Sequence, residues 1–130
     1  MTRIDEQAKR LDEEYLAISQ LFDQFCQRAG ALAEQYHFFK WPDYEDTPQL
    51  SRAFTLLGEP RELRLRCQPG ERGTLHGIIQ IVDEEELPHA SLRFSADGQL
   101  QLEAGRLLDD PPRLLLRLLL GTVWQHKPEA

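Results

Sequence analysis

Residues 4–36 decide the fold of this chain, and they read IDEQAKRLDEEYLAISQLFDQFCQRAGALAEQY. Apolar side chains recur there at alternating spacings of four and three residues, the period of one face of an α-helix. The stripe consists of Ile4, Ala8, Leu11, Tyr15, Ile18, Phe22, Phe25, Ala29, Leu32 and Tyr36. Thr2 followed by Asp5 is a helix-start signal, because the Thr hydroxyl can accept from the N–H at the third helical position and the acidic group suits the positive end of the helix dipole. We therefore predict one long helix up to residue 36 that continues through Gly30.

This stripe can be buried in two ways. It can pack on a β-sheet of its own chain, or it can pair with a second copy in a coiled coil. A two-stranded coil prefers Leu, Ile and Val at such positions, whereas this stripe carries Tyr15, Phe22, Phe25 and Tyr36. The aromatic side chains favour packing on a sheet, and different parts of the helix can follow different alternatives.

Residues 51–104 change to a period of two, which is the spacing of a half-buried β-strand. The β-branched and apolar run 74–82 is typical of a central strand. The sequence Ala-Asp-Gly-Gln at 96–99 is a hairpin signal, because glycine adopts the positive φ that the turn requires. The alternating Leu100 and Leu102 after it predict the last strand. Short connections between these runs favour an antiparallel meander of about five strands.

Residues 110–125 close the chain as a leucine-rich helix that begins after the capping residue Asp110. Its leucines occupy most of the circumference, so the helix needs cover on more than one side. They are Leu114, Leu115, Leu116, Leu118, Leu119 and Leu120. We therefore predict an α+β fold in a single domain, residues 1–130. One modest sheet can hardly cover both helices, and the surplus apolar surface predicts a homodimer.

Composition narrows the classes of partner. The formal net charge is −7 and no segment is strongly basic, which disfavours binding of duplex nucleic acid. The first residues lack the apolar stretch of a signal peptide, and no run reaches the length of a membrane span. A cytoplasmic protein that does not bind membranes is therefore expected. Cys26 and Cys67 lie in different predicted elements, and we interpret both as reduced, packed thiols.

Residues with catalytic or metal-binding potential form no recognisable pattern. The sequence contains no GxSxG, P-loop or GxGxxG motif, and the spacing of its histidines and cysteines fits no metal site. The histidines are His37, His76, His89 and His126. The acidic runs 43–46 and 83–86 are interpreted as solvated loops. We therefore expect no cofactor and no metal, and we do not favour an enzyme.

Two groups of side chains are weak candidates for a functional site. Arg64, Arg66 and Arg93 share the polar phase of neighbouring strands, with His76 close by, and a row of guanidinium groups can hold a carboxylate or phosphate. The alternative is a solvated face whose arginines pair with carboxylates across strands. The second group is a possible aromatic interaction surface, since aromatic side chains supply contact area at low entropy cost. It consists of Phe38, Phe39, Trp41, Tyr44 and Trp124.

We interpret the chain as a small acidic, non-catalytic interaction protein: an adaptor, a chaperone-like protein or a regulator that forms a homodimer or binds another protein. The alternative is a small anionic-ligand-binding protein or enzyme with a cleft between sheet and helices. The acidic helix–sheet–helix order is similar in outline to the small dimeric chaperones of bacterial secretion systems. Their internal helix between strands has no counterpart in this sequence, so we recognise no family.

Overall fold

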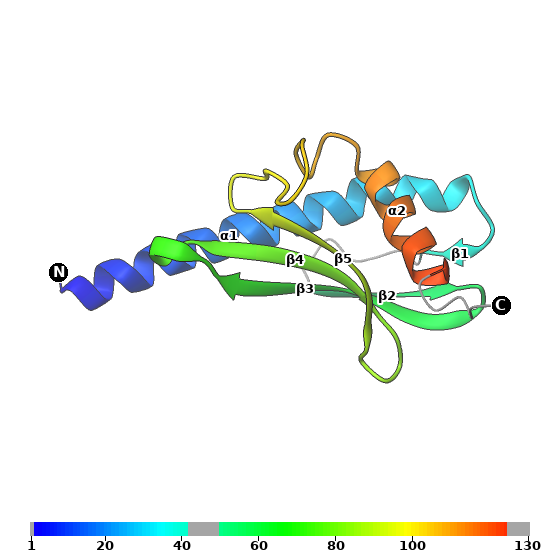
Figure 1. Cartoon of the computed structure of the whole chain (residues 1–130), viewed down its shortest axis with the longest axis horizontal. Coiled ribbons are helices and arrows are strands. Elements are labelled where there is room, and N and C mark those ends of the chain that lie inside the picture. Colours follow the sequence, from blue (N-terminus) through cyan, green and yellow to red (C-terminus); the bar gives the residue numbers. More distant parts are fainter. Residues whose placement is uncertain (1, 42–49, 125–130) are drawn as a thin grey trace.

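The computed structural model describes residues 2–41 and 50–124, and it confirms the α+β fold. The long α1 (Arg3–Ala29) passes without a break into a 3₁₀ turn, η1 (Gly30–Glu34), so the predicted helix is present and only winds more tightly at its end. A sheet follows, and α2 (Pro111–Trp124) closes the described part of the chain. Figure 1 shows α1 running along the molecule, with its first turns beyond the hairpin formed by the third and fourth strands.

The sheet has five strands in sequential antiparallel order, as the meander predicted. The strands are β1 (Phe39–Lys40), β2 (Ser51–Leu56), β3 (Glu59–Pro69), β4 (Leu75–Val82) and β5 (Pro88–Ser95), and a short 3₁₀ turn, η2 (Glu71–Gly73), joins β3 to β4. The central strand β4 is buried along almost its whole length, which its run of isoleucines predicted.

The predicted strand over Leu100 and Leu102 was wrong. Only isolated bridges form there, between Phe94 and Leu100 and between Gln99 and Arg106. The turn at Gly98 exists, with φ of 90°, but Leu102 has φ of 66° and ends the extended course of the chain. The apparent alternation failed because Leu102 projects into solvent and is 98% exposed. The segment Phe39–Lys40 supplies the fifth strand instead.

Both helices pack on the same face of the sheet, here called the inner face. A Cβ atom at Gly77 would lie 2.8 Å from Cγ2 of Ile18 in α1, and a Cβ atom at Gly121 in α2 would lie 3.7 Å from Cβ of Ala90. Ala90 pairs with Ile81, which shares the face of Gly77 because the two lie four residues apart on β4. The opposite, outer face is not covered by α1 or α2 (Figure 1).

The core lies between this inner face and the two helices. From α1 and η1 it takes the second part of the apolar stripe, and from α2 it takes four leucines. These residues are Ile18, Phe22, Phe25, Ala29, Leu32, Leu114, Leu115, Leu118 and Leu119. One chain therefore hides much more of both helices than the sequence suggested. Neither α1 nor α2 has the length and apolarity needed to traverse a bilayer, a statement that covers residues 2–41 and 50–124.

Gly77 is required for close packing in this core. We predict that Gly77→Ala lowers the free energy of unfolding by about 2 kcal/mol, because the new methyl group would lie 2.4 Å from Cζ of Phe94. Gly121→Ala is the matched control. Its methyl group meets Ala90 at an ordinary contact distance, so it should stabilise α2 by about 0.5 kcal/mol. Urea unfolding followed by circular dichroism measures both. Equal effects of the two substitutions would contradict this packing.

Candidate functional site

The three arginines of the predicted anion site do share one face of the sheet, the outer one. Arg66 pairs with Ile78 on one side, and Arg93 pairs with Ile78 on the other. Arg64 lies on β3 two residues before Arg66, opposite Gln80. Arg66 and Arg93 thus flank Ile78, with about 10 Å between their Cα atoms from the usual strand spacing. Both side chains are exposed.

Arg64 is already occupied by carboxylates. Its Nε donates to Oε1 of Glu62 at 3.2 Å, and its Nη2 lies 3.4 Å from Oε1 of Glu86. The hydrogen bond that Arg64 donates to Glu62, with a smaller effect of Glu86, raises the pKa of Arg64. Arg64 is thus paired with carboxylates, although not across strands: Glu62 lies two residues away on β3, and Glu86 lies in the turn after β4. Arg66 and Arg93 remain as the available cations of the predicted set.

His76 shares the outer face but packs against the turn that follows β3. A Cβ atom at Gly70 would lie 2.4 Å from Nε2 of His76, so the ring lies directly over that glycine. Its Nδ1 is buried and makes no hydrogen bond to the described residues. Its strand neighbours across the sheet are Gln68 and Ser95, which lie two residues along the strands from Arg66 and Arg93. The ring therefore lies beside the arginines and acts at least as a packing element.

Arg52 points away from this row, into the core. It lies on the inner face of β2, is 2% exposed, and places Nη2 2.6 Å from Oδ1 of Asp23 in α1. Asp23 lies off the apolar stripe of α1, where an aspartate is usually solvated, so the stripe gives no signal of this ion pair. The one available signal was the period-two spacing of Arg52 with Phe54 and Leu56. The ion pair joins α1 to the first long strand of the sheet.

We predict that Asp23→Ala lowers the free energy of unfolding by about 3 kcal/mol, because it removes the carboxylate from a buried guanidinium group. Asp12→Ala, the same change at an exposed position of the same helix, should alter stability by less than about 0.5 kcal/mol. Urea unfolding measures both variants. If Asp23→Ala were as mild as Asp12→Ala, the ion pair would not join the two elements as described.

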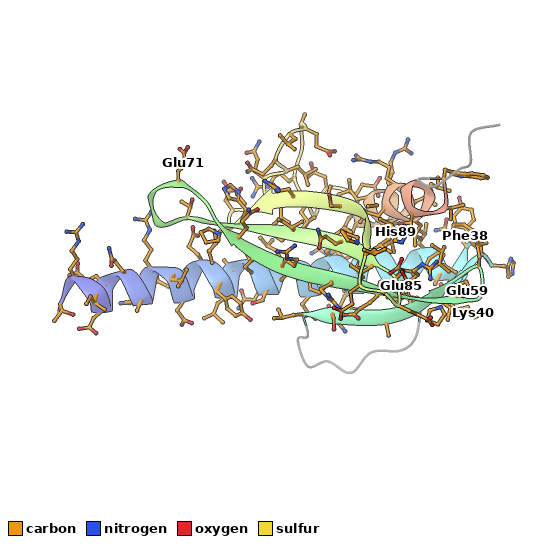
Figure 2. The ribbon with its side chains drawn as sticks, turned by 60° about the horizontal axis from the view of Figure 1, so that its bottom comes forward. Phe38, Lys40, Glu59, Glu71, Glu85 and His89 are labelled. Carbon is orange, nitrogen blue, oxygen red and sulfur yellow. The ribbon has the colours of Figure 1, made fainter. Side chains whose placement is uncertain are left out.

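The aromatic residues of the second predicted surface form a chain of ring contacts at one end of the sheet. Ring centroids are 5.5 Å apart for Tyr36 and Phe38, 5.4 Å for Phe38 and Phe39, and 6.4 Å for Phe39 and Trp41. Phe39 is only 2% exposed and belongs to the core. Phe38, labelled in Figure 2, is half-buried. Most of this cluster therefore closes the end of the core where α1 stops.

Two further residues belong to this predicted surface. Trp124 is exposed at the end of α2. Tyr44 and the acidic run 43–46 lie outside the described residues. The surface therefore remains a prediction.

A small cavity of about 190 Å³ lies where the loop after β5 meets the first turns of α2. Its charged lining includes Glu103, Arg106, Asp109, Arg113 and Arg117. Arg117 holds Glu103 by two hydrogen bonds, of 2.7 and 3.0 Å, which lower the pKa of Glu103. The cavity is smaller than ordinary small-molecule sites, and its opposite charges offset one another. We interpret it as the joint between the loop and α2.

The acidic turn after β4 is organised around Asp83. Its carboxylate accepts from the backbone N–H of Glu85 at 2.9 Å and of Leu87 at 3.1 Å, and it lies 2.7 Å from Nε2 of His89. The hydrogen bond with His89 and those from the backbone lower the pKa of Asp83. No group of three or more His, Cys, Asp or Glu side chains in the described ranges is arranged to hold a metal ion.

Both thiols are poor nucleophiles at neutral pH. Burial raises the pKa of Cys26 to about 12, although the neighbouring Arg52 acts in the opposite direction. Burial also raises the pKa of the half-buried Cys67. Since the thiolate is the reactive form, neither cysteine is activated for covalent chemistry.

The first turns of α1 form an exposed projection that we call the arm, residues 3–16. The apolar stripe continues along it as Ile4, Ala8, Leu11 and Tyr15, here called the arm stripe, which lies in phase with the buried residues that start at Ile18. All four are exposed. Figure 2 shows the arm passing the tip of the β3–β4 hairpin, which Glu71 marks. The helix is thus half core element and half projection.

The chain matches no protein-family model, no curated protein and no solved structure.

Proposed function

We propose that this chain is a non-catalytic interaction protein and that the arm is its docking element. The observation that carries the proposal is the exposure of the arm stripe: Ile4 is 75% and Leu11 51% exposed, although they repeat the spacing that buries Ile18 and Phe22. Single exposed apolar residues are normal on any protein. A regular stripe over more than three helical turns is typical of a helix face that packs against something.

The arm is built to remain helical without the support of the sheet. Thr2 and Asp5 form a capping box: Oγ1 of Thr2 accepts from the N–H of Asp5, whose carboxylate accepts from the N–H of Thr2, both at 3.2 Å. The arm meets the body mainly at the hairpin, where Oε1 of Glu14 accepts from the N–H of Leu75 at 3.4 Å. A capped, preformed helix supports docking because it does not have to be ordered when the partner binds.

The adaptor, chaperone-like or regulatory role fits this arrangement, since each requires a surface for another chain. The homodimer and the cytoplasmic location remain predictions from the sequence. The apolar surface that the two helices expose is smaller than the sequence predicted, because α2 buries four of its leucines within the chain. Leu120 and Trp124 of α2 and the arm stripe remain exposed.

We predict that Leu11→Asp removes association without harming the fold. Burying a leucine contributes about 2 kcal/mol, so the dissociation constant of any complex through the arm should rise roughly 30-fold. Leu102→Asp is the matched control, because Leu102 is exposed elsewhere. Sedimentation velocity measures self-association, and affinity capture from a lysate of the source organism compares bound proteins between the two variants. Loss with Leu11→Asp alone supports the proposal, and identical behaviour of wild type and both variants would contradict it.

A second candidate function is anion binding on the outer face of the sheet. It is favoured by Arg66 and Arg93, which flank Ile78 and make no ion pair within the part of the chain that the structure describes. Two guanidinium groups about 10 Å apart at the backbone can converge on one phosphate or carboxylate. Both side chains are exposed, so water weakens the interaction, and we rank this function second.

We predict that inorganic phosphate raises the melting temperature of the wild type if this face binds anions, and that Arg66→Gln together with Arg93→Gln abolishes the rise. Arg113→Gln with Arg3→Gln, two exposed arginines elsewhere, is a control of equal charge. Differential scanning fluorimetry at constant ionic strength makes the comparison. The same rise in all three proteins, or no rise in the wild type, would dismiss the second candidate.

A further inference from the structure

We infer that the partner of the arm is a basic amphipathic helix of another protein, which lies along the arm stripe. This inference rests on the proposed interaction function and deepens it. Three features carry it: the apolar stripe itself, the sign of the charges on its two flanks, and the absence of charge complementarity between two arms of the same kind.

The flanks of the arm stripe are acidic or neutral. Written as a heptad with Ile4 and Leu11 at d and Ala8 and Tyr15 at a, the arm has Asp5 and Asp12 at e, and Gln7 and Glu14 at g. Positions e and g border the contact between two paired helices and select the partner by charge. A partner helix that packs on the stripe therefore meets two exposed carboxylates, Asp5 and Asp12, on the e border. On the g border it meets the neutral Gln7, since Glu14 accepts from the N–H of Leu75 in the hairpin.

The basic residues of the arm lie farther round the helix. Arg3 and Arg10 occupy position c and Lys9 occupies position b, all outside the border positions. Arg10 is directed to the hairpin, where its Nε lies 3.9 Å from the site of a Cβ atom on Gly73. None of these cations stands between the stripe and an approaching helix, so the electrostatic character of the contact is set by the acids.

A second copy of the arm is a poor occupant for the same reason. Antiparallel pairing places e against e, so that Asp5 of each arm meets Asp12 of the other. Parallel pairing places g against e, and it sets Gln7 opposite Asp12 and Glu14 opposite Ser19. In the antiparallel arrangement the two aspartates repel each other, and in the parallel arrangement no pair of opposite charges forms. A helix with Lys or Arg at its own border positions gains attraction from Asp5 and Asp12.

The partner's chemistry follows from this complementarity. It presents apolar residues at helical spacing over about four turns, since the arm of 14 residues is about 21 Å long. It carries lysine or arginine beside them and has few acidic residues there. Such a helix would bind through its apolar face, as amphipathic helices commonly do. In this mode apolar anchor residues give affinity, and the flanking charges give specificity and speed up association.

The test uses the full chain and a synthetic three-heptad peptide that carries leucine and isoleucine at a and d and lysine at e and g. A second peptide with glutamate at e and g controls for the charge. Fluorescence anisotropy at two salt concentrations measures binding to the wild type and to two variants, Asp12→Lys and Glu13→Lys. These variants change the net charge equally at adjacent exposed residues, but Asp12 borders the stripe and Glu13, at position f, faces away.

We expect the lysine peptide to bind the wild type, more weakly at higher salt, and the glutamate peptide not to bind. Asp12→Lys should weaken the binding about fivefold more than Glu13→Lys, because only the former turns border attraction into repulsion. Equal effects of the two variants, or no preference for the lysine peptide, overturn the inference.

Sedimentation velocity separates failure of the inference from failure of the proposed function. Self-association that Leu11→Asp abolishes and that Asp12→Lys preserves or strengthens would show a second copy on the arm, which overturns the basic partner and leaves the docking function standing. If the wild type is monomeric, binds neither peptide and loses no bound protein through Leu11→Asp, both proposals fall.

Discussion

The sheet has one apolar face, and two helices have to share it. This constraint organises the rest of the molecule. The leucines of α2 occupy the end of the inner face near β5 and the last part of α1, and the second part of α1 crosses β3 and β4. Gly77 makes this possible, because the missing side chain lets Ile18 and Phe94 approach the strand. With the inner face filled in this way, the first turns of α1 have no sheet left to cover and project beyond it.

Most of the fold could be predicted from the spacing of apolar residues and from the turn residues between the periodic runs. The four-and-three spacing of α1, the β-branched run of β4 and the leucines of α2 are strong local signals, and the structure confirms the elements that they predict. The end of α1 shows where such signals stop. Apolar spacing indicates a helix up to Tyr36, but it does not show that the turns from Gly30 tighten into a 3₁₀ helix or that the ring of Trp41 packs over Gly30.

The errors have a common physical cause: alternation indicates two faces but not what covers them. Leu100 and Leu102 alternate like a strand, yet Leu102 is left in solvent while Leu107, farther along the same loop, enters the core. Arg52 has the phase of an inward residue and really is inward, which an arginine seldom is. The burial of Arg52 depends on Asp23, a carboxylate 29 positions earlier in the chain, and no local sequence pattern could pair the two residues.

The candidate site was predictable only in part. That Arg64, Arg66 and Arg93 share a face follows from the pleat, but the pairing of Arg64 with Glu62, two residues away on the same strand, and more weakly with Glu86 in the turn after β4 depends on side-chain directions that the pleat does not determine. The arm stripe was visible in the sequence from the start. What could not be read there was the residue at which burial ends and exposure begins, because that boundary is set by the length of the sheet and by the room that α2 takes.

The division of α1 at Ile18 also separates two kinds of selection on a single helix. A substitution at the apolar positions after this residue acts on folding, because Phe22, Phe25 and Ala29 are fully buried. Before Ile18, Arg10 and Glu14 are placed against the hairpin, and a substitution at the exposed stripe positions leaves the folded body almost untouched. The first four turns can therefore tolerate changes of sequence that the remaining turns of the same helix cannot.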